Sequence, residues 1–284
     1  MTYTVLEIGS GSYKLHREGS FSLRFQSSLG KNLHKSRLAS ESVKIALASM
    51  REQILPMLAE HEIKPSEVLV FATAAVREAM KDPRGSGEKF IRQLEDFGFE
   101  DIKVFSEEQE CLYAAMAVYE ELKDDYQDFL LLDTGGASHQ LIEIAAGDIV
   151  QQKSFPIGSH ADLSKIQLPN YLAHNYSQDK PLALIGTSAA ILHEIPNMNR
   201  NSLVEIVENL EPMDIEARRN FLKLLIPNEA SYDLLVDFRL AVINNAFRII
   251  LEIAQQLRCF DFLYSPSQSM NFVSVRGFAL HEIS

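Results

Sequence analysis

The 284-residue chain has no tryptophan and only two cysteines, Cys111 and Cys259. The two cysteines lack the close spacing of metal ligands, so the sequence predicts a protein of a reducing compartment, with the cytoplasm as the expected location. No apolar run approaches the roughly 20 residues that span a bilayer, and we expect no membrane segment. No basic start with an apolar core precedes the strand-like residues at Tyr3, so we expect no signal peptide.

Basic residues are few relative to acidic ones. The chain has 27 Lys and Arg against 39 Asp and Glu, a formal net charge of −12. This balance argues against non-specific binding of nucleic acid. A polyanionic substrate would therefore need local compensation from backbone amides, a few Lys and Arg residues, and a metal ion.

Residues 129–141 predict a buried strand, a tight turn and a returning strand. The apolar run ends at Asp133, and Gly135 and Gly136 follow in the turn. Glycines let backbone N–H groups face outward with no Cβ in the way, which is how a turn cradles phosphate oxygens. Asp133 would sit beside those oxygens and could hold a divalent cation or its water. The alternative is a β-hairpin in which Asp133 only caps the turn.

Residues 3–15 repeat this plan near the N-terminus, where Glu7–Ser12 aligns with Asp133–Ser138 without a gap. Two hairpins of this kind, roughly half a chain apart, predict two similar halves facing each other across a cleft. The polar joint Lys123–Tyr126 is the expected boundary between them.

Strands and helices alternate along the chain, which predicts the mixed α/β class. The expected domains are 1–123 and 124–284. Helices are expected at 40–61, 88–97, 107–122, 202–225 with a break at Pro212, and 234–257. Further strands are expected at 19–26, 68–72, 102–105, 148–155, 181–185 and 260–264.

Two strand-to-helix junctions carry residues that suit a phosphate. Small residues after strand 68–72 let a helix begin near the expected cleft, where Arg77 could reach a phosphate. The alternative for Arg77 is a surface arginine. Gly186 and Thr187 open a second helix whose N-terminal N–H groups could bind an anion. The alternative there is a simple N-cap.

Residues 106–112 open the helix expected at 107–122. Ser106 and Gln109 resemble a capping box. Glu107, Glu108 and Glu110 complement the helix macrodipole in the first turn. These structural roles account for most of the acids, and position alone does not identify a catalytic one.

Taken in order, the motifs resemble the exopolyphosphatase and guanosine pentaphosphate phosphatase (Ppx/GppA) family of the actin, hexokinase and Hsp70 fold group. The resemblance implies an α/β protein of two ribonuclease H-like, actin-type domains flanking a central cleft. It also implies a short form without the helical C-terminal domain of longer members. The matching segments are Glu7–Ser12, Ala72–Ala79, Ser106–Leu112, Asp133–Gln140, Pro156–Gly158 and Gly186–Thr187.

The resemblance implies attack by water on the terminal phosphoryl group of inorganic polyphosphate or guanosine pentaphosphate, with Mg²⁺ or another divalent cation. Such a reaction depends on positioning and charge neutralisation. By this resemblance Glu110 is the general base, Arg77 neutralises the substrate, and Asp133 and Glu7 bind the metal. The alternative for Glu110 is a first-turn helix acid. The implied phosphate-binding residues are Ser10, Gly11, Ser12, Gly135, Gly136, Ala137, Ser138, Gly186 and Thr187.

Several positions depart from the family pattern. Gln140 replaces an acid and Glu7 replaces an aspartate, while Gln109 and Leu112 replace a glutamate and an arginine. An amide cannot act as a base and is a poorer metal ligand. The departures leave a slow hydrolase, a hydrolase of altered substrate, or a protein that binds such anions without turnover as a sensor or partner.

A kinase of the same fold group that uses ATP is disfavoured, because no segment clearly suits adenosine. The family resemblance also suggests a homodimer. Nucleic acid and membranes are not expected partners.

Overall fold

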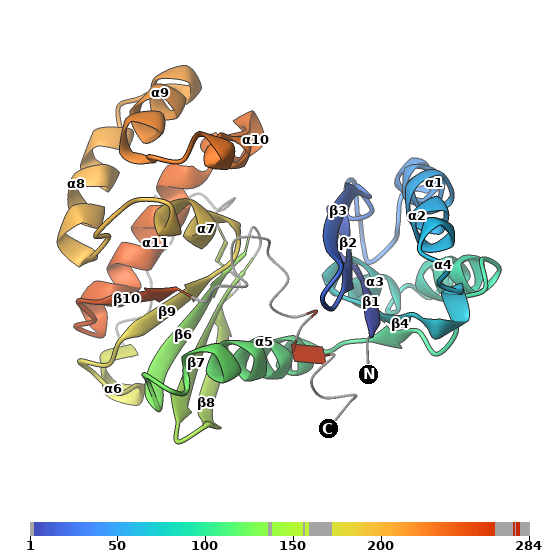
Figure 1. Cartoon of the computed structure of the whole chain (residues 1–284), viewed down its shortest axis with the longest axis horizontal. Coiled ribbons are helices and arrows are strands. Elements are labelled where there is room, and N and C mark those ends of the chain that lie inside the picture. The colour runs from blue at the N-terminus through green and yellow to red at the C-terminus, as the bar shows by residue number, and fades with distance from the viewer. Residues whose placement is uncertain are drawn as a thin grey trace. The chain divides into compact units, whose positions relative to one another are not determined.

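The computed structural model describes residues 3–135, 138–155, 157–158, 172–264, 275 and 277–278 (Figure 1). The chain divides into two compact units. Unit 1 comprises Met1–Ala114 and Ser274–Ser284, and unit 2 comprises Ala115–Val273. The division falls inside helix α5 (Glu107–Leu122), earlier than the boundary expected at the polar joint after that helix. The joint itself is the turn between α5 and the next strand.

Unit 1 contains a five-stranded mixed sheet in the order β3-β2-β1-β4-β5. Strand β2 pairs antiparallel with both β1 and β3, whereas β4 runs parallel to β1 and β5 runs parallel to β4. The strands are β1 (Thr4–Ile8), β2 (Ser12–Arg17), β3 (Phe21–Gln26), β4 (Leu69–Ala72) and β5 (Lys103–Val104).

Helices cover one face of this sheet, where alternate strand residues such as Leu6, Ile8 and Leu15 are fully buried (Figure 1). The helix expected at 40–61 is confirmed, although its middle turn is π-helical. The helical elements are α1 (Ser40–Ser49), η1 (Met50–Ile54), α2 (Leu55–Glu60), η2 (Pro65–Glu67), α3 (Ala74–Ala79) and α4 (Ser86–Glu95).

Unit 2 contains a second five-stranded sheet, in the order β10-β9-β6-β7-β8. The strand pairing repeats the plan of unit 1. Strand β7 pairs antiparallel with both β6 and β8, whereas β9 runs parallel to β6 and β10 runs parallel to β9. The repeat predicted from the two hairpins is therefore confirmed in the topology. The strands are β6 (Asp128–Thr134), β7 (His139–Ala145), β8 (Asp148–Phe155), β9 (Leu182–Ile185) and β10 (Phe262–Tyr264).

The helices of unit 2 pack on its sheet through one apolar core. The single helix expected at 234–257 is wrong in its first part, because Val236 is extended and the regular helical spacing of buried residues begins only at Ile243. The break at Pro212 is confirmed. The elements are α6 (Leu172–Asn175), α7 (Thr187–His193), α8 (Arg200–Leu210), α9 (Ile215–Leu225), η4 (Glu229–Leu234), α10 (Asp237–Leu240) and α11 (Ile243–Gln256).

Among the described residues, none of the helices has the length and apolar character needed to cross a bilayer.

The described C-terminal residues belong to unit 1. Phe278 is 1% exposed, and its ring centroid lies 5.1 Å from that of Phe71, 5.0 Å from Phe105 and 5.5 Å from Tyr113. A Cβ on Gly277 would lie 1.7 Å from the Tyr113 carbonyl oxygen, so only glycine permits this approach. The segment thereby packs against the start of α5. The sequence also predicts a short last helix after Gly277, and beyond residue 278 this helix lies outside the described residues.

A buried acid joins two segments of unit 2. The Glu143 carboxylate on β7 accepts hydrogen bonds from the Ser177 hydroxyl and, at 3.1 Å, from the Lys180 ammonium. Burial opposes ionisation of this carboxyl, but these bonds outweigh it, so the pKa of Glu143 lies below its ordinary value of 4.5. Because the pKa is lower in the folded protein than in the unfolded chain, the ionised Glu143 stabilises the fold at pH values above its pKa in the unfolded chain. This stabilisation is lost as the pH falls through the pKa of Glu143 in the folded protein.

We therefore expect Glu143→Gln to lower the free energy of unfolding by about 1–3 kcal/mol at pH 7, because the half-buried Lys180 ammonium loses its charged partner. Urea unfolding between pH 7 and pH 3 measures the effect, and the loss of stability below pH 4.5 should be smaller in the variant than in the wild type. The control is Glu211→Gln, whose side chain is 60% exposed in its ion pair with Arg248. It should cost less than about 1 kcal/mol. If the free energy of unfolding changed with pH equally in the wild type and in Glu143→Gln, the lowered pKa of Glu143 would be contradicted.

Candidate active site

The two glycine turns have the same closing hydrogen bond. The Gly9 N–H donates to the Ser12 carbonyl at 3.0 Å, and the Gly135 N–H donates to the Ser138 carbonyl at 3.0 Å. A Cβ would lie 2.9 Å from the accepting oxygen at Gly9 and 2.6 Å from it at Gly135. Both turns therefore require glycine at their first position.

The first turn is fixed through its carbonyl groups. Gly30 N–H donates to the Ser10 carbonyl at 2.6 Å, and the amides of Ser27 and Ser28 donate to the Gly11 carbonyl. Ser10 is half-buried and Gly11 is exposed. Among the described residues, the Ser10 and Gly11 amides donate to no protein group. They therefore remain available to an anion.

In the second turn, Gly136 and Ala137 lie outside the described residues, while Gly135 and Ser138 are half-buried. Asp133 at the end of β6 is in register with Gln140 on β7, and Gln140 is in register with Ser154 on β8. Cross-strand partners share one face of a sheet. The acid therefore has an amide and a hydroxyl residue on its own face.

Gly186 joins this hairpin to helix α7. Its φ is 100°, and a Cβ would lie 2.5 Å from the Thr134 carbonyl oxygen, so the backbone of β9 can approach the hairpin only with glycine here. Thr134 adds a hydrogen bond from its hydroxyl to the Ile185 carbonyl at 2.9 Å. Thr187 begins α7, and its side chain lies outside the described atoms.

His139 follows the second turn and was not singled out from the sequence. It is fully buried, and its Nδ1 lies 2.6 Å from the Ile157 carbonyl oxygen, to which it donates. Burial lowers the pKa of His139 to about 4, so the imidazole is neutral at physiological pH. Its hydrogen bond ties Ile157 to the hairpin.

Three predicted elements of unit 1 meet at the carboxyl ends of its parallel strands. The Thr73 N–H donates to the Ile8 carbonyl at 3.1 Å, and the Phe105 N–H donates to the Ala72 carbonyl at 2.9 Å. The ends of β1, β4 and β5 are therefore neighbours. The first glycine turn, the start of α3 and the start of α5 lead away from this shared edge.

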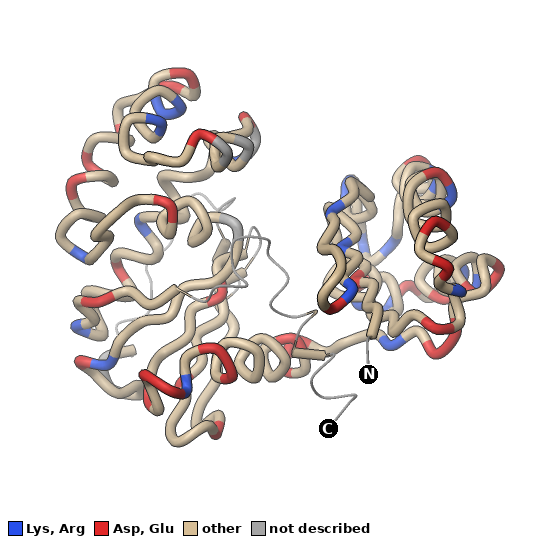
Figure 2. The backbone as a smooth tube through the Cα atoms, viewed as in Figure 1, with Lys and Arg blue, Asp and Glu red and all other residues tan. Residues whose placement is uncertain are grey.

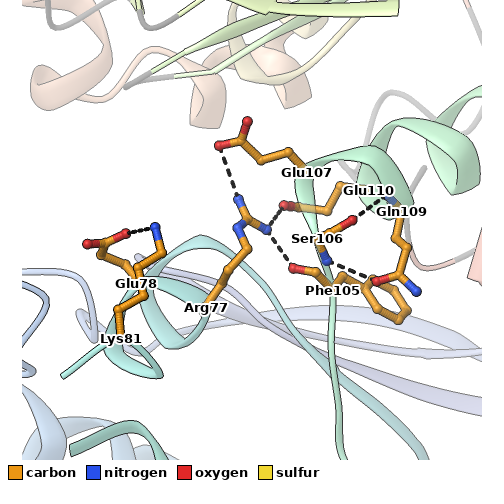
Figure 3. A network of polar contacts seen from close by, with 8 residues as sticks. All are labelled: Arg77, Glu78, Lys81, Phe105, Ser106, Glu107, Gln109 and Glu110. Carbon is orange, nitrogen blue, oxygen red and sulfur yellow. Dashed lines mark hydrogen bonds and ion pairs between the residues drawn. The ribbon is translucent and has the colours of Figure 1, made fainter. Parts of the chain in front are cut away.

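Arg77 and Glu110 form the central ion pair of this edge (Figure 3). The Arg77 Nη1 donates to Glu110 Oε2 and, at 2.8 Å, to the Phe105 carbonyl oxygen. Its Nη2 lies 3.7 Å from Glu107 Oε1. The Arg77 and Glu110 side chains are 21% and 23% exposed, whereas Glu107 is 50% exposed. The structure thus brings the predicted base and the predicted arginine together.

The neighbouring residues of α5 have capping roles. The Ser106 N–H donates to Gln109 Oε1 at 2.9 Å, and the Gln109 N–H donates to the Ser106 hydroxyl at 3.2 Å, so the predicted capping box is confirmed. A hydrogen bond from its own backbone, then one from the Ser106 hydroxyl and the charge of Arg77, lower the pKa of exposed Glu108. Leu112, where the family pattern has arginine, is 39% exposed.

The Glu7 carboxylate is ion-paired with a lysine that the sequence analysis did not consider. Lys14 Nζ lies 2.8 Å and 2.9 Å from its two oxygens. In the part of the chain that the structure describes, no three His, Cys, Asp or Glu side chains lie together as a metal-binding group.

The sequence of this chain matches the model of the Ppx/GppA phosphatase family over residues 5–164. The chain belongs to the Ppx/GppA phosphatase family. A crystal structure of the Aquifex aeolicus Ppx/GppA family member is 18% identical, with a TM-score of 0.76 over 100% of this chain and 99% of that one. An exopolyphosphatase from Cytophaga hutchinsonii is 16% identical, with a TM-score of 0.70 over 100% and 99% of the two chains.

These similarities extend over the whole length and establish an α/β fold with two mixed five-stranded sheets. No protein with a curated description matches the sequence. The placement of the two units around a cleft stays a prediction.

Proposed function

We propose that this member of the Ppx/GppA family hydrolyses phosphoanhydrides, releasing the terminal phosphate of inorganic polyphosphate or guanosine pentaphosphate by attack of water. Family membership supports the reaction class. The ion pair between Arg77 and Glu110, at the edge where the first glycine turn begins, is the observation that carries the proposal.

In this proposal Glu110 accepts the proton of the attacking water. The guanidinium of Arg77 holds this carboxylate in one orientation, and a general base must be positioned within hydrogen-bond reach of the proton that it takes. Arg77 is fixed by the Phe105 carbonyl as well as by Glu110, so its charge is positioned before substrate binds. Positioned charge of this kind stabilises the negative oxygens of a phosphoryl group without reorganisation during the reaction.

The glycine turns and the α7 junction are the proposed phosphate contacts. Their residues are Ser10, Gly11, Ser12, Gly135, Gly136, Ala137, Ser138, Gly186 and Thr187.

Asp133 is the proposed ligand for Mg²⁺. Its carboxylate is the kind of oxygen donor that this ion prefers, and Gln140 and Ser154 follow it in register on the same face of the sheet. One carboxylate is enough where substrate phosphates and waters supply the remaining ligands. Bound there, the ion would neutralise charge on the phosphate.

The test is phosphate release by the purified full chain from polyphosphate and from guanosine pentaphosphate, side by side, with Mg²⁺ and with EDTA. Release from either substrate above a no-enzyme blank supports the proposal. Tight binding without release would overturn it and favour the alternative, a sensor or partner protein, for which the buried amide Gln140 in place of an acid is the supporting observation. Transfer of phosphate from ATP to an acceptor would indicate a kinase.

The proposed homodimer and the cytoplasmic location rest on the resemblance and on cysteine usage. Sedimentation of the purified chain at several concentrations tests the first, and cell fractionation tests the second.

A further inference from the structure

One row of residues crosses the sheet of unit 1 in register, one residue from each strand. The row consists of Lys103, Phe71, Glu7, Lys14 and Arg24, on β5, β4, β1, β2 and β3. Partners in register lie on the same face. This face is opposite to the one carrying the helix-covered core residues Leu6 and Ile8, because successive strand residues alternate. The row contains three cations and a single acid.

The acid of this row is bound by its neighbouring cation. Both oxygens of Glu7 lie within 2.9 Å of Lys14 Nζ, and the two side chains are 8% and 15% exposed. The pair lies beside the first turn, because a Cβ built on Gly9 would be 3.4 Å from Glu7 Oε1. A divalent cation at Glu7 would have to displace a largely buried ammonium from both oxygens.

A second cation of the row contacts the turn directly. Arg24 Nε donates to the Ser12 hydroxyl at 3.0 Å. Burial lowers the pKa of Arg24, and the charge of Glu7 opposes that shift, so the guanidinium also feels the acid of the row. Glu7, Lys14 and Arg24 together carry a net positive charge beside the first turn, whose Ser10 and Gly11 amides donate to no protein group among the described residues.

The equivalent row of unit 2 has no cation. It consists of Ile185, Asp133, Gln140 and Ser154, and neither β6 nor β7 contains a Lys or Arg residue. Figure 2 shows basic residues on the β2–β3 strands of unit 1, inside a chain of net charge −12. The two turns share their closing hydrogen bond and differ in the charge of the residues in register beside them.

We propose that the first turn binds phosphate without a metal, and that Lys14 supplies the cation. This inference rests on the proposed function. Lys14 contacts a phosphate oxygen together with the Ser10 and Gly11 amides, and Arg24 orients the Ser12 hydroxyl. Glu7 is a positioning residue for Lys14, which revises the metal-ligand role expected from the sequence. A glutamate reaches one methylene further than aspartate, which helps it to bridge to the ammonium on the next strand. The dependence on Mg²⁺ then belongs to Asp133.

The experiment measures binding of inorganic tripolyphosphate to the full chain by isothermal titration calorimetry, once in EDTA and once with Mg²⁺. We expect the wild type to bind in EDTA. Lys14→Met should weaken that affinity about 10- to 100-fold, the range for losing a hydrogen bond from a charged donor. Lys44→Met is the matched control, since Lys44 is 77% exposed on α1 and should leave the affinity unchanged.

Two carboxylate variants separate the roles of the acids. Asp133→Asn should remove the gain in affinity that Mg²⁺ gives. Glu7→Gln should keep that gain, because Glu7 does not hold the metal in this proposal. The double variant Glu7→Gln, Lys14→Met removes both charges and leaves no buried carboxylate unpaired, so it keeps the measurement valid if Lys14→Met alone unfolds. It should bind as weakly in EDTA as Lys14→Met.

Several results would overturn the inference: no binding of tripolyphosphate by the wild type in EDTA, wild-type affinity in both Lys14 variants, or loss of the Mg²⁺ effect in Glu7→Gln. Its failure is distinguishable from failure of the proposed hydrolysis. Binding in EDTA that depends on Lys14, in a protein that releases no phosphate, would support the metal-free site and overturn the enzyme.

Discussion

Glu110→Gln should lower the rate of phosphate release by about 10²- to 10⁴-fold, the usual contribution of a general base. The amide has the shape of the carboxylate and can still accept a hydrogen bond from Arg77, but it cannot take a proton from water. Steady-state kcat on polyphosphate measures the loss. Tripolyphosphate affinity should fall far less than kcat, because the substituted group acts on water and not on the anion.

The matched control is Glu108→Gln. Glu108 is an exposed acid in the first turn of the same helix, and the ion pairs of Arg77 described here go to Glu107 and Glu110. It should keep kcat within about twofold, because Glu108 is exposed and the proposed general base is Glu110. An unchanged kcat in Glu110→Gln, or an equal loss in both variants, would refute the assignment of Glu110 as base.

Phe278→Ala should lower the free energy of unfolding by about 3–5 kcal/mol, the usual cost of removing a buried aromatic ring. The ring is 1% exposed and contacts three aromatic partners, Phe71, Phe105 and Tyr113. Denaturant unfolding of the full chain measures the loss. Activity should fall as well, because the Phe105 carbonyl, which holds Arg77, belongs to the residue whose ring packs against Phe278.

Phe260→Ala is the control for ring size, since Phe260 is 46% exposed. It should cost less than about 1 kcal/mol, as a half-exposed ring leaves little cavity. Equal losses of stability in the two variants would show that the C-terminal segment does not complete the core of unit 1.

The two hairpins and the α/β class could be predicted because their causes are local. An apolar run that ends at an acid and a glycine specifies a strand and a tight turn, and the same pattern at Glu7 and at Asp133 indicates the repeat. The capping box of α5 was predictable for the same reason, since Ser106 and Gln109 satisfy each other within one helical turn.

Pairings across long distances in the sequence could not be predicted from local pattern. Arg77 and Glu110 are brought together only because β4 and β5 are parallel neighbours, and the sequence suggested the pair solely through family resemblance. The docking of Phe278 on Phe71 has no local signal at all. Nor does the sequence show that the chain leaves the helix expected at 234–257 at extended Val236 and again before Ile243.

The pairing of Lys14 with Glu7 is a different case, because it could have been predicted from the sequence. Once the turn from Gly9 to Ser12 is recognised, the antiparallel register places residue 14 opposite Glu7. Considered alone, Glu7 suggests a metal ligand, and the register adds the Lys14 ammonium opposite it.

The return of the chain to unit 1 has a consequence for biosynthesis. Unit 2 is made of one continuous segment, whereas the aromatic cluster of unit 1 is incomplete until residue 278 has left the ribosome. Domains generally fold as whole units during translation, with the N-terminal one first. Here unit 2 can mature before the aromatic cluster of unit 1 is complete. The helix-covered core of unit 1 is built from residues between Leu6 and Val104, so it is the aromatic cluster that must wait for Phe278.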